Sequence, residues 1–418
     1  MAATDRAGAA TRLIATAVIA LGLGPVHAEP GAASKATLAG RAGRAAPAAR
    51  SGTTYKVSGE VGGYGDTDAV YVASPTISLG AGDPLAGWSV TGRYLVDAVS
   101  AASVDIVTSA SGKWTEYRHV GSLAVELPLG AAQLAISGGV SREHDYLSLG
   151  GGATVSFDLL NKNLTPFIGV SYGDDQAGRT GEPKEFWRGM QKVGLQAGAT
   201  FVVDRSTIAG ITFDAIAERG YLGKPYRFVP LFGPGRGAAL AAGASPDEVN
   251  RARLDQRPAD AVPEARDRIA VTGRIAHRWD GVTLRLDQRL YGDTWGLLAS
   301  TSELRVWLDA GSHVLLGPHL RFHGQRGVSF WQRTYEATAD VEGKLLGPPR
   351  YRTGDRELGP LGTLTAGASL RWLLTDRGSR PVTFFLQVDG GQTRFLDALY
   401  ITRRLALYSA VGLEAEID

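Results

Sequence analysis

The 418-residue sequence contains no cysteine and only two methionines. Disulfides, thiolate metal sites and the Cys-x-x-Cys-His attachment of haem are therefore excluded. Neither a His-Glu-x-x-His zinc motif nor a phosphate-binding loop occurs, so we expect no catalytic residues, no metal site and no enzymatic activity of the chain's own. The net charge is only +2, which does not support a nucleic-acid partner.

The sequence also lacks a long apolar run. A membrane-spanning helix needs about 20 apolar residues, whereas the N-terminal run "LIATAVIALGLG" is shorter. This run follows Arg6 and Arg12 and precedes "VHA", with Val26 and Ala28 at the small-residue positions of a cleavage site. The pattern predicts a secretory signal peptide over residues 1–28. Residues 29–52 are rich in Ala, Gly, Pro and Arg without periodicity, which indicates a flexible leader.

What the sequence does contain is alternation. In "VTLRLDQRLYGD", residues 282–293, apolar side chains occupy one parity and charged side chains the other. An extended strand would therefore have one apolar and one charged face. Such a strand suits either a soluble sheet over a core or a membrane barrel with lipid outside and a wet lumen inside. Similar segments, separated by Gly, Asp and Asn turn signals, fill the chain from residue 53 to 418.

The length of these segments distinguishes the two environments. Globular strands average about 5 to 6 residues, whereas tilted membrane strands need about 9 to 11. Most segments here are of the longer kind. We therefore predict an all-β fold, a transmembrane antiparallel β-barrel of roughly 16 strands, with a range of about 12 to 18. A secreted β-sandwich or solenoid is the alternative. Aromatic residues near segment ends indicate interface girdles: Trp279, Tyr291, Trp295, Phe330, Trp331, Tyr335 and Tyr400.

Four strings carry a resemblance to a known family: "YLVDAVSAASVDIVTSAS", "LRLDQRLYGDTWG", "LGPHLRFHGQRGVSFWQRTY" and "YRTGDRELGPL". They resemble those of a family of uncharacterised bacterial exported proteins regarded as outer-membrane β-barrels. The resemblance implies a location in the bacterial outer membrane, with membrane lipid and the barrel-assembly machinery as partners, but no activity. The sequence departs from the wider barrel class at Asp418, where assembly signals usually carry a terminal aromatic residue.

The polar parity of the central segments predicts the lumen lining. Arginines outnumber carboxylates there, so an open lumen is expected to favour anions. Alternatively, the opposite charges interlock and fill the barrel. His319 and His323 cannot share a metal by themselves, because four residues of strand span roughly 14 Å. The predicted lumen residues are Arg274, Arg285, Asp287, Arg289, Glu303, Arg305, His319, Arg321, His323 and Arg371.

Two long polar insertions, near residues 221–267 and 343–358, interrupt the alternation. If the strand number is even and both termini are periplasmic, these insertions are extracellular loops. Within the first, Ser245 is a predicted helix N-cap and Pro246 the first helical residue, followed by Asp247 and Glu248 in the first turn.

A small-residue stretch suggests a cofactor. The sequence Asp97-x-x-Ser100-Ala-Ala-Ser103 is followed by Asp105-x-x-Thr108-Ser-Ala-Ser111. Both copies resemble the Asp-x-x-Ser/Thr-Gly-Ala-Thr/Ser sequence at which a periplasmic transferase attaches FMN through a phosphoester. By that resemblance Ser103 and Ser111 would be the acceptors, although the central Gly and terminal Thr are absent. A close-packed strand or turn is the other interpretation.

Taken as a sequence, the chain is therefore expected to be a porin-like barrel acting as a passage or envelope scaffold. The alternatives are a barrel-associated electron carrier with covalent FMN and a secreted soluble β-protein that binds through its long loops.

Overall fold

A computed structural model describes residues 52–101, 114–339, 342, 344–375 and 380–417. The predicted signal peptide, almost all of the predicted leader and the residues Ser103, Asp105, Thr108 and Ser111 lie outside these ranges. None of the helices in the described ranges has the length and apolar character needed to cross a membrane.

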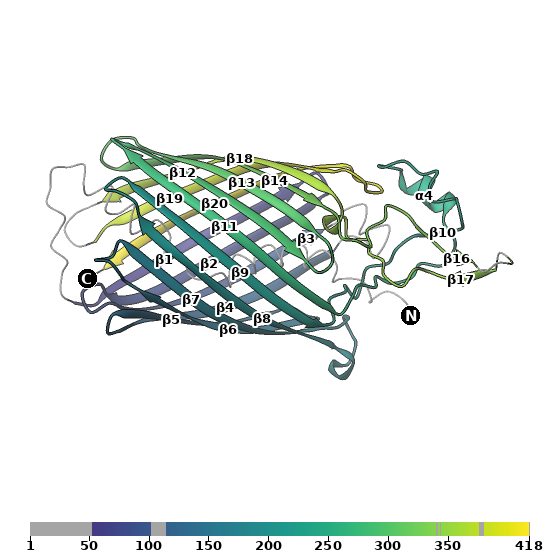
Figure 1. The fold of residues 1–418 in the computed structure, drawn as a ribbon, viewed down its shortest axis with the longest axis horizontal. Helices are drawn as coiled ribbons and strands as arrows, with labels where there is room; N and C mark the ends of the chain where they lie inside the picture. Colours follow the sequence, from purple (N-terminus) through teal and green to yellow (C-terminus); the bar gives the residue numbers. More distant parts are fainter. Residues whose placement is uncertain (1–51, 102–113, 340–341, 343, 376–379, 418) are drawn as a thin grey trace.

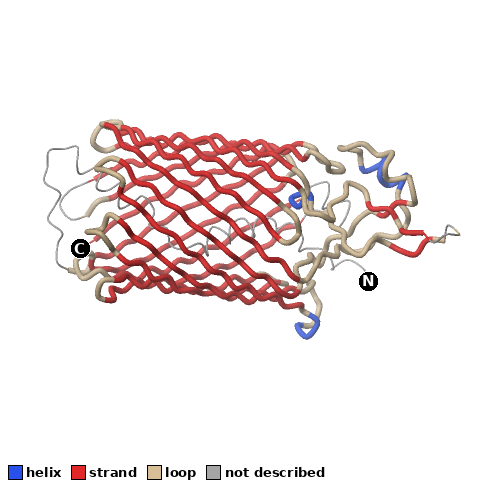
Figure 2. The backbone as a smooth tube through the Cα atoms, viewed as in Figure 1, coloured by secondary structure: helices blue, strands red, loops and turns tan. Residues whose placement is uncertain are grey.

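The structure is one closed barrel of sixteen strands, with short elements in the connections at one end (Figures 1 and 2). Every neighbouring pair in the wall is antiparallel, and the strands run from 11 residues in β5 to 16 in β4. This confirms the predicted fold and strand number. The wall strands are β1 (Thr54–Asp66), β2 (Val70–Asp83), β3 (Trp88–Ala101), β4 (Trp114–Leu129), β5 (Ala132–Arg142), β6 (Tyr146–Phe157), β7 (Leu164–Ala177), β8 (Arg188–Val202), β9 (Thr207–Gly220), β11 (Ala265–Trp279), β12 (Val282–Asp293), β13 (Leu298–Asp309), β14 (Val314–Arg326), β18 (Leu361–Thr375), β19 (Val382–Phe395) and β20 (Arg403–Ile417).

The first and last strands close the barrel. They pair from Tyr55 opposite Ile417 to Asp66 opposite Ala406. Because the strand number is even, β1 begins and β20 ends at the same end of the barrel, the end marked C in Figure 1, which we call the termini end. The long connections lie at the opposite end, which we call the cap end. The arrangement is that of outer-membrane barrels, with short turns on the periplasmic side and long extracellular loops.

The outer surface of the wall is apolar. In β12, Leu286 and Leu290 are 46% and 57% exposed, whereas Asp287 between them points inward and is half-buried. In β20, Leu405, Leu407 and Leu413 are likewise exposed. A closed sheet with apolar side chains outside and charges inside rules out the secreted β-sandwich and soluble binding protein, whose apolar faces would be buried.

Aromatic residues are exposed near both ends of the outer surface, as interface girdles require. Trp279 is among them, but Trp295 and Tyr335 are 5% and 2% exposed. These two belong to the packed cores of the cap-end loops, so their assignment to a girdle was wrong. The sequence pattern gave the wrong result because aromatic residues near a strand end can anchor either lipid or a loop. Exposed aromatics of the wall are Tyr55, Phe157, Phe201, Trp279 and Trp372 toward the termini end and Tyr71, Tyr117 and Tyr172 toward the cap end.

The two longest connections, residues 221–264 and 327–360, form a folded cap (Figure 1). The second is longer than the predicted 343–358, because residues 327–342 pack into the cap rather than continuing the wall. The cap contains β10 (Leu231–Phe232), α4 (Pro246–Ala252), β15 (Tyr335–Glu336), β16 (Thr338–Ala339), β17 (Leu345–Gly347) and the 3₁₀ turn η2 (Arg356–Leu358); a further 3₁₀ turn, η1 (Lys184–Phe186), lies between β7 and β8.

Small apolar cores hold the cap together. β10 and β15 pair in parallel, and Val229, Leu231, Tyr335 and Ala337 form one buried cluster. Helix α4 buries Val249 in a second cluster. The predicted helix start is confirmed, since Ser245 and Glu248 form a complete capping box with Pro246 in the first turn.

Candidate functional site: the lumen wall and its capped mouth

The residues expected to line the lumen lie on β11, β12, β13, β14 and β18, on the face opposite the exposed leucines. Most of them are paired. Asp287 accepts from the Nε atoms of both Arg274 and Arg285, the latter at 2.5 Å. Arg305 donates to Glu303 at 2.8 Å within β13. These pairs interlock along the wall as the sequence alternative anticipated.

Other partners come from strands that the sequence analysis left out of the lumen set. Arg289 of β12 donates to Asp214 of β9 at 2.9 Å, and Arg371 of β18 lies 3.5 Å from Glu414 of β20. The side chains of Arg289 and Arg274 are 44% and 38% exposed although they point into the barrel. Water therefore reaches this part of the lumen wall.

A histidine and an aspartate join strands that are not neighbours. His319 Nε2 on β14 lies 2.7 Å from Asp389 Oδ1 on β19, and both side chains are largely buried. Gly367 of β18 stands between them in register with both residues. A Cβ at position 367 would collide with the Asp389 carboxylate. The glycine therefore leaves the space that the His319–Asp389 contact crosses.

Two lumen arginines in the middle of the described wall have no ion pair. Arg93 on β3 is exposed and stands between Ser78 and Ser122 on the neighbouring strands. Arg321 on β14 is also exposed, and the carboxylate opposite it, Glu303, bonds Arg305 instead. His323 Nδ1 forms a hydrogen bond of 2.8 Å with Thr301 Oγ1. No carboxylate of the described residues contacts His323.

Toward the cap end the inward side chains become buried, and their charges form pairs. Asp97 of β3 accepts from Arg118 of β4 at 2.7 Å and from Ser74 of β2 at 2.5 Å, with Asp97 and Arg118 only 3% and 1% exposed. Asp175 of β7 accepts from Tyr146, Ser148 and Lys192. Similar pairs continue around the ring at Glu218–Arg268 and Arg266–Asp293. We call this set the rim ring.

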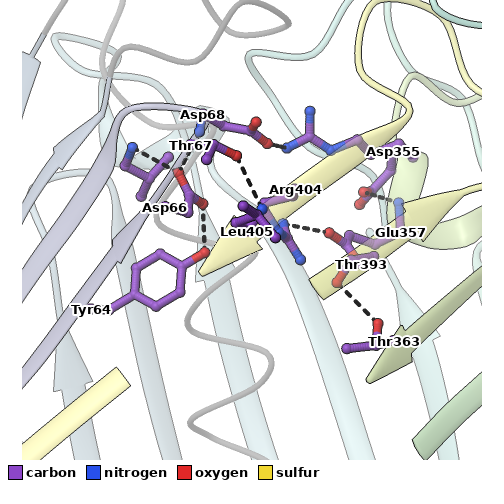
Figure 3. A network of polar contacts seen from close by, with 12 residues as sticks. Tyr64, Asp66, Thr67, Asp68, Asp355, Glu357, Thr363, Thr393, Arg404 and Leu405 are labelled. Atoms are coloured by element: carbon purple, nitrogen blue, oxygen red, sulfur yellow. Dashed lines mark hydrogen bonds and ion pairs between the residues drawn. The ribbon is translucent and has the colours of Figure 1, made fainter. Parts of the chain in front are cut away.

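The turn η2 ties the cap to the rim (Figure 3). Asp355, just before the turn, binds Lys224 at 2.5 Å and Arg227 at 2.8 Å, both from the first long connection. Arg356 donates to Asp68 of the β1–β2 turn at 2.5 Å. Glu357 accepts from Arg404 of β20 at 2.8 Å. Three consecutive charged residues thus bind three different parts of the chain, and we call them the cap hub.

The electrostatics of the cap hub favour the ionised carboxylate. Burial by itself would raise the pKa of Asp355, but Arg227 and Lys224 outweigh it and hold that pKa well below its ordinary value. Burial, followed by the nearby Arg227 charge, lowers the pKa of Lys224. Burial raises the pKa of the neighbouring Asp260. The sequence analysis missed this hub, although its string "TGDREL" lies within one of the stretches that carried the family resemblance.

Two further groups of residues resemble functional sites in composition, but we do not assign either as a site. Carboxylate oxygens of Glu116, Glu143 and Asp145 lie within 4.8 Å of one another and are buried, a spacing that can hold a divalent cation. Tyr226 already donates to Asp145 at 2.5 Å. The string "GVSYG", residues 169–173, has the Gly-x-Ser-x-Gly spelling of a nucleophile elbow, but it lies inside β7 rather than at a strand-to-helix turn.

The proposed flavin motif is described only in its first residues. Asp97 and Ser100 both lie in β3, where they point to opposite faces of the wall because they are three residues apart. The carboxylate of Asp97 is bound by Arg118 and Ser74. Ser103, Asp105, Thr108 and Ser111 are outside the described residues, so flavin attachment stays a prediction.

Comparison with known families finds one match. Residues 182–384 match a family described as "Protein of unknown function (DUF3570)". The match runs from the β7–β8 connection into β19 and confirms the expected resemblance to uncharacterised proteins over that range. No protein of curated function matches the sequence.

Several solved outer-membrane structures are similar in architecture. A "Bacterial polysaccharide outer membrane secretin" is 7% identical with a TM-score of 0.45, and the alignment covers 88% of this chain and 98% of that one. OccK7 (OpdD) of Pseudomonas aeruginosa is 8% identical with a TM-score of 0.43, covering 87% and 98%. OprD of the same organism is 7% identical with a TM-score of 0.42, covering 88% and 98%. Identities this low concern architecture alone.

Proposed function

We propose that this protein is a water-filled passage for small polar solutes across the bacterial outer membrane. The observation that carries this is the solvent exposure of Arg289 and Arg274, whose side chains point into a closed barrel of sixteen strands. Barrels of 16 to 18 strands are wide enough to leave an aqueous channel rather than a core filled by side chains. We assign no catalytic role to the wall.

The rim ring and the cap define the restricted end of this passage. Inward residues are exposed in the middle of the wall, as at Arg93 and Arg321, but buried at the cap end, as at Asp97 and Asp175. Solutes entering from outside therefore meet the cap and the rim ring before the wider lumen. Size selection belongs at that end, where the network of ion pairs is densest.

We further propose that the passage weakly favours anions. Most of the expected cation surplus is cancelled by Asp214, Asp389 and Glu414, which come from strands far away in the sequence. Arg93 and Arg321 keep exposed guanidinium groups without an ion pair. Fixed positive charge in a wet lumen raises the local concentration of anions. These two residues would therefore favour anions, opposed by Glu60 and Glu126, which also face inward without an ion pair in the described wall.

Planar bilayer recordings test both parts of this proposal. Under a potassium chloride gradient, the wild-type reversal potential should favour chloride, and the double variant Arg93→Glu with Arg321→Glu should shift it toward potassium. The matched control is Arg289→Gln with Asp214→Asn, which removes both partners of one ion pair and leaves the lumen net charge unchanged. Its reversal potential should equal that of wild type.

Two results would count against the proposal. Cation selectivity of the wild-type protein would contradict the anion preference but would not contradict the role as a passage. Absence of any conductance from correctly folded protein contradicts the passage itself and favours an envelope scaffold.

A further inference from the structure

Three arginines gather on the outer surface of the barrel at the cap end of β14, β18, β19 and β20. The register places Gly324, Gly362, Arg394 and Arg403 side by side in one row across these four strands. Arg394 and Arg403 have the same parity as the outward residues of their strands, and both are exposed. Arg326 lies two residues beyond Gly324 on the same face of β14 and is also exposed.

The row directly below is almost entirely apolar. It consists of Phe322, Leu364, Gln392 and Leu405, which are in register across the same four strands. Phe322, Leu364 and Leu405 are 55%, 50% and 42% exposed. One step of two residues along a strand covers about 7 Å. The arginines therefore stand immediately above the apolar band, at the level where lipid headgroups begin.

These arginines have no counter-charge in the described part of the chain. Arg403 donates to the Gln392 side chain at 3.3 Å, and no carboxylate of the described residues lies within ion-pair distance of Arg326, Arg394 or Arg403. Arg394 and Arg403 are direct cross-strand partners, and like charges in that position destabilise a sheet. An external anion would relieve this repulsion.

The space around the arginines is open. Gly324 and Gly362 offer no side chain between Arg326 and Arg394. Two separate open hollows lie beside this surface. One of about 330 Å³ borders Arg326 between β13 and β14, and the other, of about 360 Å³, borders Arg403 at the β19–β20 connection. We call the surface with Arg326, Arg394 and Arg403 above and Phe322, Leu364 and Leu405 below the outer patch.

A second outward arginine at the cap end shows the contrast. Arg219 of β9 is 53% exposed in its side chain, but it donates to Asp267 of β11 at 2.6 Å. Its charge is neutralised within the wall. The row formed by Arg326, Arg394 and Arg403 differs in being basic without compensation.

We propose that the outer patch binds a phosphate group of a phosphorylated glycolipid in the outer leaflet, with the acyl chains lying along Phe322, Leu364 and Leu405. Guanidinium groups bind phosphate oxygens in pairs, with charge assistance. Basic clusters next to an apolar membrane face are typical of anionic headgroup recognition. The outer leaflet follows from the position of the patch at the cap end, on the side of the long loops.

Native mass spectrometry of the detergent-purified protein tests this with three defined probes: diphosphorylated lipid A, the same lipid with its phosphates removed, and phosphatidylglycerol. Wild type should bind the diphosphorylated lipid at least about tenfold more tightly than either other probe, about 1.4 kcal/mol. The double variant Arg394→Gln with Arg403→Gln should lose that preference. Arg219→Gln is the matched control and should keep it.

A stability readout separates binding from a loss of fold. Without lipid, the double variant should unfold at the same temperature as wild type or above it, because the cross-strand repulsion is gone. Added lipid A should raise the unfolding temperature of wild type only. The variant should also conduct as wild type does, since these side chains lie outside the lumen, so the passage is tested separately.

Four results would overturn the inference. These are equal binding of the dephosphorylated lipid, equal loss in Arg219→Gln, phosphatidylglycerol binding as tight as that of lipid A, and a wild-type dimer that the double variant abolishes. The last would assign the outer patch to an interface with a second copy of this chain.

Discussion

Neighbouring residues of one strand meet two different solvents. Leu123 of β4 is 54% exposed on the outer surface, while Ser122 before it is exposed on the inner surface. Alternation at this scale decides what each position tolerates. Because Leu123 lies in the middle of a 16-residue strand, its side chain is expected to be in hydrocarbon.

Arginine substitution at these two positions should therefore have unequal effects. Leu123→Arg should lower the free energy of unfolding by about 2 to 4 kcal/mol, the cost of a basic side chain near the bilayer midplane. Ser122→Arg should lower it much less, because water surrounds the new charge and only the cross-strand repulsion from Arg93 opposes it. Urea titration of protein refolded into lipid vesicles measures both. Equal destabilisation by the two variants would show that the inner surface is dry.

Flavin attachment is also a residue-scale prediction. If the motif is modified, protein co-expressed with an FMN transferase should gain the mass of one or two FMN units less water and absorb visible light after denaturation. Ser103→Ala and Ser111→Ala should each remove one unit. If the mass is unmodified in cells where the transferase modifies a control substrate, the flavin interpretation of residues 97–111 would be wrong and close packing would be their role.

Residue faces were readable from the sequence, but residue partners were not. Parity alone puts Arg289 and His319 on the lumen side. Their partners Asp214 and Asp389 lie on strands separated from them by many residues, and only the closed register brings them together. For the same reason, the sequence overstated the cation surplus of the lumen.

At the scale of elements, the cap depends on one short turn. Asp355 holds two buried cations, Lys224 and Arg227. Asp355→Asn would remove the carboxylate that contacts both of them, and breaking a buried pair costs about 3 to 5 kcal/mol. Limited proteolysis should then cleave residues 221–264 and 327–360 faster, with the barrel intact. Asp397→Asn is the control, since its pair with Arg333 is more exposed. Unchanged cleavage in Asp355→Asn would show that the apolar clusters alone hold the cap.

The same carboxylate gives the cap a pH dependence. Its folded pKa lies below the unfolded value of 3.8, so its contribution is fully present above about pH 3.8 and is lost as the pH falls further. Asp260 has the opposite pH dependence. Burial raises its pKa by destabilising the charged carboxylate, so its protonation at low pH stabilises the cap. The hydrogen-exchange protection of the wild-type cap, taken relative to the intrinsic exchange rate at each pH, should fall below that pH, whereas Asp355→Asn should be weakly protected throughout. A wild-type cap that stays protected at pH 2 to 3 would contradict this.

Among the elements, α4 was predictable and the paired strands of the cap were not. Helix α4 is specified by local residues, since its capping box joins Ser245 and Glu248, which are three positions apart. β10 and β15 each have two residues, and a tertiary cluster around Leu231 and Tyr335 sets their pairing. Aromatic residues such as Trp295 could serve a girdle or a loop core, and sequence alone does not distinguish them.

At the scale of the whole molecule, the barrel follows from long alternating strands. Segments such as Val282–Asp293 are too long and too charged on one face for a globular sheet, and their number fixed the expected size of the barrel. The height and packing of the cap do not follow from that pattern, because they depend on contacts between residues 221–264, residues 327–360 and the β1–β2 turn.

The seam between β1 and β20 has a consequence for assembly. Most other wall pairs join strands that follow each other along the chain through short connections, whereas the seam joins its two ends. Loop-closure entropy makes such a contact late and slow. Until it forms, both end strands have unpaired backbone groups along one edge, which hydrocarbon does not tolerate. We therefore expect the nascent wall to need protection while it is an open sheet, and a chain that ends before Arg403 should aggregate rather than close into a smaller barrel.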